Sequence, residues 1–342
     1  MSEIRTFRVI VRGDPPDTVR TLSGPLVGPS MGLVLREDNF VGRMEAEAAR
    51  GGVTFWHKTS ATEVTRDGGR YRVQNTYEGK PSGSVLCDWV LDAGGYDSRV
   101  SRRFGITREL EPESFHLGYE LTTTDPGTLP DGQVAMWMGS WAPAGYIWSF
   151  PASKDGRPAR RVGVGTPRSV KDPQGRTIGA KVFFDAWARE CPGYVGEALA
   201  HEGGIIPTYR PGRSLHRGRV LSLGDAARLC DPVTGGGIAP AIGSGLAAAR
   251  AVEMSDPGLY EQLVEPYRAE ARLRWWFKQV FLGMGDEELR RFFDLFCAFP
   301  VPDDAGDPYA LRRQVLRYLR RGGFKPLAVL WGSGRLWKAL MG

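Results

Sequence analysis

The strongest candidate for chemistry is a glycine-rich turn between an apolar strand and a helix of small residues. The run 220–225 (VLSLGD) is apolar and ends in Gly-Asp, and a loop with Pro232 and three consecutive glycines then leads into a helix near Ile238. Unpaired N–H groups and the helix dipole attract an anion there, and glycines let the backbone approach a flat ring or a phosphate. Asp225 adds an acceptor for ribityl or ribose hydroxyls. The bare glycines also fit an ordinary turn before a tightly packed helix.

A run of alternating aromatic residues is the second candidate. Tyr146, Trp148 and Phe150 lie two positions apart, and Pro143 and Pro151 flank them. Alternate residues of a strand face the same side, so the three rings form one wall. Such a wall suits a long apolar chain, and it is equally the pattern of a strand that faces an ordinary core.

Cysteines and histidines indicate neither a metal site nor a disulfide framework. The four cysteines form no CxxC pair, and the four histidines lack the spacing of metal ligands. We therefore expect no bound metal and a reducing, cytoplasmic compartment. The residues concerned are Cys87, Cys191, Cys230, Cys297, His57, His116, His201 and His216.

Composition places the chain among globular proteins, with 42% hydrophobic and 25% charged residues. Its 45 glycines among 342 residues exceed the usual share of about 7%, which favours a cofactor-binding α/β enzyme with many close backbone approaches. No apolar run reaches the roughly 18 residues of a membrane-spanning helix, and the first residues lack the pattern of a signal peptide.

The basic charge is concentrated at the C-terminus. The net charge is +6, and residues 311–342 carry eight basic residues and no acidic one. Trp331 and Trp337 are interleaved with these charges. A basic, tryptophan-containing segment can lie on an anionic membrane surface, or it can pack on the core as terminal helices with a solvated basic face. No nucleic-acid-binding module accompanies it, so we expect no nucleic-acid partner.

The elements that must position these residues follow an α/β, sheet, α/β order with a helical end. The turn signal Asp67-Gly68-Gly69 predicts a hairpin. No break in composition marks a boundary, so we expect interwoven domains. Strands are expected at 6–11, 53–56, 61–65, 70–76, 84–92, 115–122, 133–138, 146–150, 161–165, 205–209 and 220–223, and helices at 39–50, 178–190 and from 238 onward.

The glycine-rich turn resembles the second FAD-binding motif of the flavoprotein monooxygenase and reductase superfamily. The shared pattern is Gly-Asp-Ala-Ala, four residues, Pro, two residues and Gly-x-Gly, beginning at Gly224. In that superfamily the Asp contacts the ribityl and pyrophosphate region of FAD, and the glycine loop backs the isoalloxazine ring. Arg228 stands where a small residue is common. The resemblance implies FAD as the cofactor, bound by Asp225, Pro232, Gly235, Gly236, Gly237 and Ile238.

The aromatic run narrows the resemblance to the geranylgeranyl reductases. The nine residues 143–151 match the PxxYxWxFP pattern of that family at every fixed position. The implied chemistry is hydride transfer from reduced flavin to a C=C bond, with a proton added to the adjacent carbon; it assigns no residue as the proton donor. The resemblance implies that the prenyl chain is bound by Pro143, Tyr146, Trp148, Phe150 and Pro151.

Two weaker matches support the same family. The run 34–55 resembles its Arg-x-x-Phe-Asp helix and following strand, although the spacing is one residue longer and Val41 replaces the Asp; it implies that Arg36 contacts the flavin phosphates. The run 90–105 resembles its Ala-Asp-Gly segment, with Gly94 in place of the usual Asp. Gly94 has no carboxylate, so any hydrogen bond that the family's Asp makes at this position is absent here.

The family's first βαβ unit, with G-x-G-x-x-G and a following acidic residue, has no counterpart in these residues. Three explanations compete: a misassigned start, a separate polypeptide that carries the unit, or a degenerate homologue. A parallel sheet without its central strands exposes an apolar edge. We therefore expect this chain to need an N-terminal partner segment.

Together these features predict an α/β (mixed α+β) fold. We expect a partial, Rossmann-like FAD-binding domain (1–105 and 203–256), an interleaved antiparallel substrate-binding sheet (106–202) and a helical C-terminal region (257–342). The implied function is FAD-dependent reduction of C=C bonds in isoprenoid (geranylgeranyl-type) lipid chains for membrane lipid biosynthesis, with a prenylated lipid as substrate and peripheral membrane contact through 311–342. Two alternatives stay open: a flavin-dependent aromatic monooxygenase or halogenase-like enzyme, and a non-catalytic prenyl-lipid-binding homologue.

Overall fold

The computed structural model describes residues 2–4, 6–15, 18, 20–23, 32–34, 37–108, 114–168, 170–210, 212, 214–281 and 283–297. Arg36 and the basic segment 311–342 therefore lie outside the described residues. The chain divides into two compact units, which we describe separately. Unit 1 comprises 1–40, 115–206 and 276–342, and unit 2 comprises 41–114 and 207–275.

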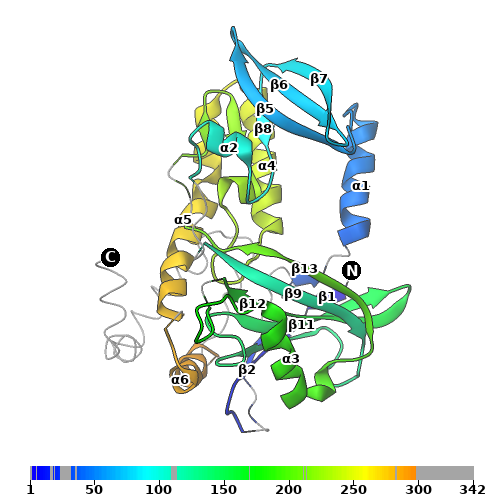
Figure 1. Cartoon of the computed structure of the whole chain (residues 1–342), viewed down its shortest axis with the longest axis vertical. Helices are drawn as coiled ribbons and strands as arrows, with labels where there is room; N and C mark the ends of the chain where they lie inside the picture. The colour runs from blue at the N-terminus through cyan, green and yellow to red at the C-terminus, as the bar shows by residue number, and fades with distance from the viewer. Residues whose placement is uncertain are drawn as a thin grey trace. The chain divides into compact units, whose positions relative to one another are not determined.

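Unit 1 is built on a seven-stranded sheet in the order β13-β9-β12-β11-β10-β2-β3 (Figure 1). Its described pairs are antiparallel except that β10 runs parallel to β2, a strand more than 120 residues earlier in the chain. The aromatic run 146–150 is confirmed as part of a strand. The strands of this sheet are β2 (Thr6–Val11), β3 (Arg20–Ser23), β9 (Phe115–Thr124), β10 (Gln133–Met138), β11 (Tyr146–Lys154), β12 (Arg157–Pro167) and β13 (Ala198–Pro207).

Helices cover both faces of this sheet. On one face, α3 (Ala180–Glu190) inserts Trp187 against Trp137 of β10, with ring centroids 4.8 Å apart and an interplanar angle of 61°. On the other face, α6 (Asp286–Cys297) packs Leu289 and Phe293 against Val9 and Val11 of β2. The larger core lies under α3 and contains Leu129, Ala135, Trp137, Ala142, Ile147, Val162, Val164, Ala180, Phe184 and Trp187. A further strand pair joins β1 (Ser2–Ile4) to β4 (Gly32–Val34).

Unit 2 contains an antiparallel sheet, β5-β6-β7, and a small sheet in the order β14-β15-β8, in which β15 and β8 are parallel. The predicted hairpin at Gly68-Gly69 is confirmed between β5 and β6. Close packing of α4 on α5 depends on Gly243, because a Cβ there would lie 2.6 Å from the Tyr267 hydroxyl. The elements that lie wholly or mostly in this unit are α1 (Glu37–Arg50), β5 (Thr59–Asp67), β6 (Arg70–Tyr77), β7 (Lys80–Cys87), β8 (Val90–Asp92), α2 (Arg99–Arg103), β14 (His216–Arg217), β15 (Val220–Ser222), α4 (Ile238–Glu253) and α5 (Pro257–Phe281).

The strand predicted at 53–56 is wrong. The backbone there is irregular, and the side chains of Val53, Phe55 and Trp56 are exposed. An extended segment becomes a strand only when a neighbour completes its hydrogen bonds, and no described strand pairs with this one. The single strand predicted at 84–92 is two strands, β7 and β8, separated at Asp88 and Trp89.

No helix in the described part of the chain is long and apolar enough to cross a membrane. No group of three or more His, Cys, Asp or Glu side chains in that part is placed to bind a metal ion.

Candidate functional site

In unit 2 the glycine-rich turn joins the end of β15 to the start of α4. Gly224 adopts a left-handed backbone with φ of 50°, and its N–H donates to the Ser244 hydroxyl of α4 at 3.0 Å. A Cβ on Gly224 would stand 3.1 Å from the Cβ of Ala241. A side chain at 224 would therefore need a strained backbone and would push the helix away by a few tenths of an ångström.

Asp225 and Gly237 meet where the loop closes. The position of a Cβ on Gly237 lies 3.1 Å from Oδ1 of Asp225, so a side chain at 237 would crowd the carboxylate. Burial raises the pKa of Asp225, and no hydrogen bond from another described residue engages its carboxylate. The structure thus brings together Asp225 and Gly237, two of the predicted cofactor residues. The Asp225 carboxylate is available to accept a hydrogen bond from a ligand.

The start of α4 is open to a ligand in the same region. Gly237 is its N-cap and supplies no side chain to cap the first N–H groups, while Ile238 is exposed. Gly235 is left-handed, with φ of 72°. This combination of a glycine cradle, an available carboxylate and an uncapped helix start fits the ribityl, ring and phosphate groups of FAD.

A buried ion cluster that we did not predict fixes the shape of this loop. Asp231 accepts hydrogen bonds from the N–H groups of Val233 at 2.8 Å and Thr234 at 3.2 Å. Its second oxygen pairs with Arg274 of α5, which also contacts Glu270 at 3.2 Å. Burial raises the pKa of Glu270. The dipeptide Asp231-Pro232 was a visible turn signal, whereas nothing in the sequence pointed to an arginine 43 residues away.

At the end of β8, the carboxylate of Asp92 lies beside Gly94, the position where the family usually has an Asp. Asp92 is buried and accepts hydrogen bonds from the Gly94 N–H at 3.0 Å, the Ser98 hydroxyl at 2.5 Å and the Ser101 N–H at 2.9 Å. Its carboxylate therefore fixes the segment that leads into α2. A Cβ at 94 would stand 3.0 Å from Oδ1 of Asp92, so glycine is the residue that this arrangement accepts.

In unit 1 the aromatic run lies across the middle of the seven-stranded sheet. Trp148 of β11 is paired with Gly163 of β12, and Gly163 with Glu120 of β9. The Trp148 indole N–H donates to Glu120 Oε2 at 2.7 Å. A Cβ on Gly163 would lie 2.5 Å from Cζ2 of Trp148. The indole therefore lies over Gly163 of the neighbouring strand, and its N–H is bound by the Glu120 carboxylate one strand further on.

The neighbouring row continues this surface. Tyr146 is paired with Gly165, and Gly165 with Gly118. The Tyr146 and Trp148 rings have centroids 5.6 Å apart. By strand alternation, Tyr146, Trp148 and Phe150 face the same side as this glycine row. We call this side of the sheet, with Glu120 and the three glycines, the aromatic face.

The two prolines of the aromatic run have local structural roles. Pro143 lies in a turn closed by the Gly145 N–H, which donates to the carbonyl of Ala142 at 2.9 Å. Ala144 has φ of 55°, as the third residue of a type II turn requires. Pro151 is buried within β11 opposite Arg160. The predicted substrate residues thus lie on one continuous turn and strand.

Comparisons with known proteins agree with both motifs. Residues 28–276 match the FAD binding domain family. The digeranylgeranylglycerophospholipid reductase of Picrophilus torridus is 30% identical over 291 residues, which cover 81% of this chain and 71% of the relative. Its Thermoplasma volcanium counterpart is 30% identical over 288 residues, or 80% of this chain and 70% of the relative.

A solved structure gives the same fold. It is a geranylgeranyl bacteriochlorophyll reductase-like protein from Thermoplasma acidophilum, with a TM-score of 0.78 and 24% identity over 93% of this chain and 82% of that one. The family match, the reductase relatives and the shared fold lead to one conclusion: the chain belongs to the FAD-binding domain family, in its geranylgeranyl reductase branch, and is an FAD-dependent oxidoreductase.

Proposed function

We propose that this chain reduces C=C bonds in the isoprenoid chains of a prenylated lipid. The row Trp148–Gly163–Glu120 carries this proposal. It forms a flat floor with an aromatic edge, which suits an extended hydrocarbon chain better than a compact aromatic substrate. The reductase relatives, whose names specify a digeranylgeranylglycerophospholipid, support the same substrate class.

The residues of the chain divide the work between the two motifs. Reduced FAD supplies the hydride when it is bound. In the proposal, Asp225 accepts from ribityl hydroxyls, and Pro232 with Gly235, Gly236 and Gly237 lies against the ring. Ile238 and the first turn of α4 face the phosphates, and Arg36 contacts them. Tyr146, Trp148 and Phe150, with their flanking prolines, bind the prenyl chain and exclude water from it.

Anaerobic reoxidation of the flavin tests this function. The FAD-loaded protein is reduced chemically and mixed with a digeranylgeranylglycerol phospholipid, and flavin absorbance is followed without oxygen. We expect the oxidised spectrum to return with the unsaturated lipid and not with its saturated analogue. A Trp148→Ala variant should react far more slowly, and Trp275→Phe, a substitution in unit 2, serves as the matched control. Equal rates with both lipids would refute the proposal.

Two other functions predict different results in this assay. A monooxygenase or halogenase would reoxidise its flavin only when oxygen is admitted. A non-catalytic prenyl-lipid-binding homologue would bind the lipid on the aromatic face and retain no flavin on gel filtration.

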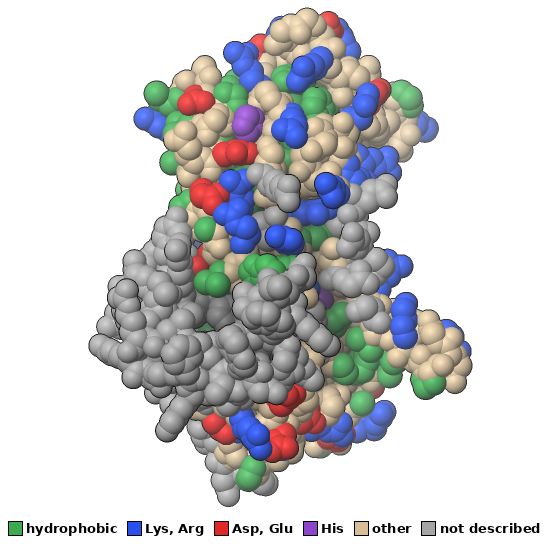
Figure 2. Space-filling view, turned by 90° about the vertical axis from the view of Figure 1, so that its left-hand side faces the viewer, with side chains coloured by type: hydrophobic (Ala, Val, Ile, Leu, Met, Phe, Trp, Pro, Cys, Tyr) green, Lys and Arg blue, Asp and Glu red, His purple; other side chains and the backbone are tan. Residues whose placement is uncertain are grey.

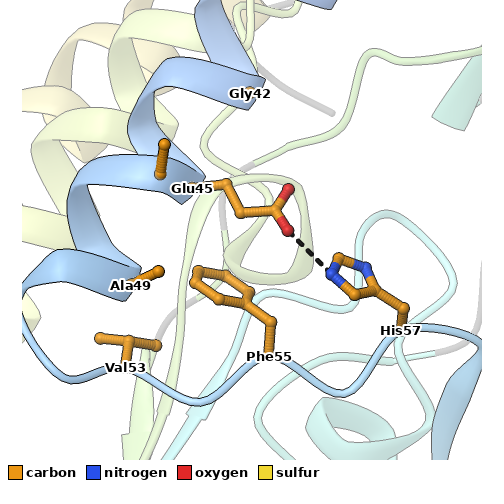
Figure 3. A pocket seen from close by; sticks show the side chains of 7 residues that line it. Gly42, Glu45, Ala49, Val53, Phe55 and His57 are labelled. Atoms are coloured by element: carbon orange, nitrogen blue, oxygen red, sulfur yellow. Dashed lines mark ion pairs between the residues drawn. The ribbon is translucent and has the colours of Figure 1, made fainter.

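We further propose that a strand–helix–strand segment covers an apolar area of unit 2. β8 pairs with β15 on one side, and no described strand lies on its other side. Leu91 at its centre is 46% exposed, and Trp56 is 55% exposed. Figure 3 shows Ala49, Val53 and Phe55 lining a hollow beside α1, closed at one side by Glu45 and His57, whose Oε1 and Nε2 lie 2.9 Å apart. A parallel edge with apolar neighbours normally receives another strand.

Light scattering of the purified chain tests the partner segment. We expect association or poor stability of the chain alone, relieved by Phe55→Ser together with Trp56→Gln. A stable, monodisperse monomer of the unaltered chain would contradict the proposal.

Membrane contact through 311–342 is also part of the proposal. On the face shown in Figure 2, the described hydrophobic side chains form separate small groups among charged ones. The eight basic residues and the tryptophans of 311–342 are the candidate for contact with an anionic surface. Deletion of 311–342 should abolish sedimentation with anionic vesicles and leave the weak binding to zwitterionic vesicles unchanged. Undiminished binding to anionic vesicles would refute this contact.

A further inference from the structure

Ile206 of β13 lies across two glycines of the aromatic face. Its Cδ1 is 3.2 Å from the position of a Cβ on Gly118 and 3.3 Å from that on Gly165. These two glycines are paired on the neighbouring strands β9 and β12. A single aliphatic side chain therefore spans two strands, and the missing side chains at 118 and 165 give it the room.

An indole and an imidazole border the same place. Cζ3 of Trp148 is 3.5 Å and Nδ1 of His116 is 4.0 Å from the Cβ position of Gly165, and Tyr146 is paired with that glycine. The row of aromatic rings on β11 thus ends where Ile206 lies.

Exposure falls from one end of the aromatic face to the other. Arg161, which is paired with Phe150, has a side chain that is 29% exposed, and the hairpin residues 154–158 beyond it are exposed. At the opposite end His116 is 5% exposed, and its pair Pro167 is also buried. Because a charged phosphate headgroup is costly to remove from water, a prenylated phospholipid enters from the exposed end. Its hydrocarbon tail then points toward the buried end.

The tail meets Ile206 at this buried end. We propose that Ile206 limits how far a prenyl tail reaches along the aromatic face and so sets the prenyl length that the protein accepts. The glycine floor continues beyond it, because the Cβ position of Gly118 is 3.5 Å from the Gly204 carbonyl oxygen, and no described residue has an atom within 4 Å of the Cβ position of Gly204 itself. A shorter side chain at 206 therefore uncovers space for a further isoprene unit. This inference rests on the proposed function.

Equilibrium binding tests the limit without any turnover. The FAD-loaded full chain is titrated in mixed micelles with a digeranylgeranylglycerol phospholipid and with the analogue whose prenyl tails are one isoprene unit longer. We expect the unaltered protein to favour the digeranylgeranyl lipid at least tenfold, since even one methylene in a fitted pocket changes selectivity by about 10–200-fold. Ile206→Ala should make the two affinities nearly equal. Ile206→Val, which removes only the δ-methyl over the glycines, should lower the preference in part.

Two further variants test the direction and the location of the effect. Ile206→Phe enlarges the obstruction, so the preference should move to the analogue whose tails are one isoprene unit shorter. Ile205→Ala is the matched control, because residue 205 lies on the same strand and faces the opposite side of the sheet, and it should leave the preference unchanged. The ratio of single-turnover flavin reoxidation rates with the lipids should follow the ratio of their affinities in each variant.

The outcomes separate the length limit from the proposed function. Equal binding of both lengths by the unaltered protein, or an unchanged preference in both Ile206→Ala and Ile206→Val, would overturn the limit, and so would an equal loss of preference in Ile205→Ala. If the preference depends on Ile206 but no lipid reoxidises the flavin, the proposed function fails while the limit stands. Reoxidation by every lipid at equal rates in every variant would leave the function standing and exclude the limit.

Discussion

Substitution of Gly163 by alanine is the sharpest test of how Trp148 is held. The new Cβ would lie 2.5 Å from Cζ2 and 2.6 Å from Cε2 of the indole, and 2.8 Å from the backbone carbonyl oxygen of Tyr119. The ring either stays and overlaps the methyl group, which costs about 1–3 kcal/mol, or moves and loses its hydrogen bond to the Glu120 carboxylate, which contributes about 1.5–3 kcal/mol. The ring adopts whichever of these two responses costs less free energy. We therefore expect the free energy of unfolding to fall by about 2 kcal/mol.

Thermal unfolding followed by circular dichroism measures this loss. About 2 kcal/mol corresponds to a fall in Tm of roughly 3 °C for a protein of this size, at about 2.1 cal/mol/K of unfolding entropy per residue. Gly204→Ala is the matched control, because Gly204 lies in the same sheet on β13 with no atom within 4 Å of its Cβ position, and it should change stability by less than about 0.5 kcal/mol.

The double variant Gly163→Ala/Trp148→Leu tests whether the clash with the indole causes the loss of stability. In a Trp148→Leu background the indole is absent, so Gly163→Ala should cost clearly less than in the unaltered chain, the residual coming from the Tyr119 carbonyl. Gly163→Ala as stable as Gly204→Ala would refute the reasoning, and so would equal costs in the two backgrounds.

Three further predictions concern the flavin loop, the buried histidine and the aromatic face. Arg274→Met leaves Asp231 and Glu270 without their cation, so the loop 231–237 should loosen and FAD affinity should fall roughly tenfold, as measured by fluorescence titration; full affinity would contradict the role of this cluster. Because the pKa of His116 is lowered to about 3 in the fold, the unfolded chain binds an extra proton between about pH 3 and 6.5, and the free energy of unfolding should fall by up to about 1.4 kcal/mol per pH unit as pH drops through this range. His116→Leu should flatten that dependence in urea titrations, and an unchanged slope would exclude His116 as its source. Glu120→Gln keeps a weaker acceptor for the indole, so lipid affinity should fall by less than in Glu120→Ala, and equal losses would show that Glu120 acts by charge alone.

Local patterns in the sequence predicted the elements that carry both motifs. The alternation at Tyr146, Trp148 and Phe150 required a strand, and the run of small residues after Gly237 required a closely packed helix. The Gly68-Gly69 hairpin was equally local. In each case the chemistry of a few consecutive residues decides the structure, so no distant partner had to be known.

Long-range pairing explains what the sequence did not reveal. The parallel pairing of β2 with β10 and the bond from Trp148 to Glu120 join residues far apart in the chain, and no short motif encodes them. The segment 53–56 has the composition of a strand, but a strand forms only beside a partner that completes its hydrogen bonds. No described strand pairs with this segment. His116 was missed for the same reason, since an isolated histidine acquires meaning only through its burial in the fold.

Mass spectrometry of the lipid product tests the central claim most directly. The FAD-loaded chain is supplied with a chemical reductant and a digeranylgeranylglycerol phospholipid without oxygen, and the lipid is extracted and weighed. The account predicts stepwise addition of two hydrogen atoms per reduced double bond, and loss of the product in Trp148→Ala. Recovery of an unaltered lipid from protein whose flavin is bound and reduced, or a product that has gained oxygen or halogen once air is admitted, would contradict it.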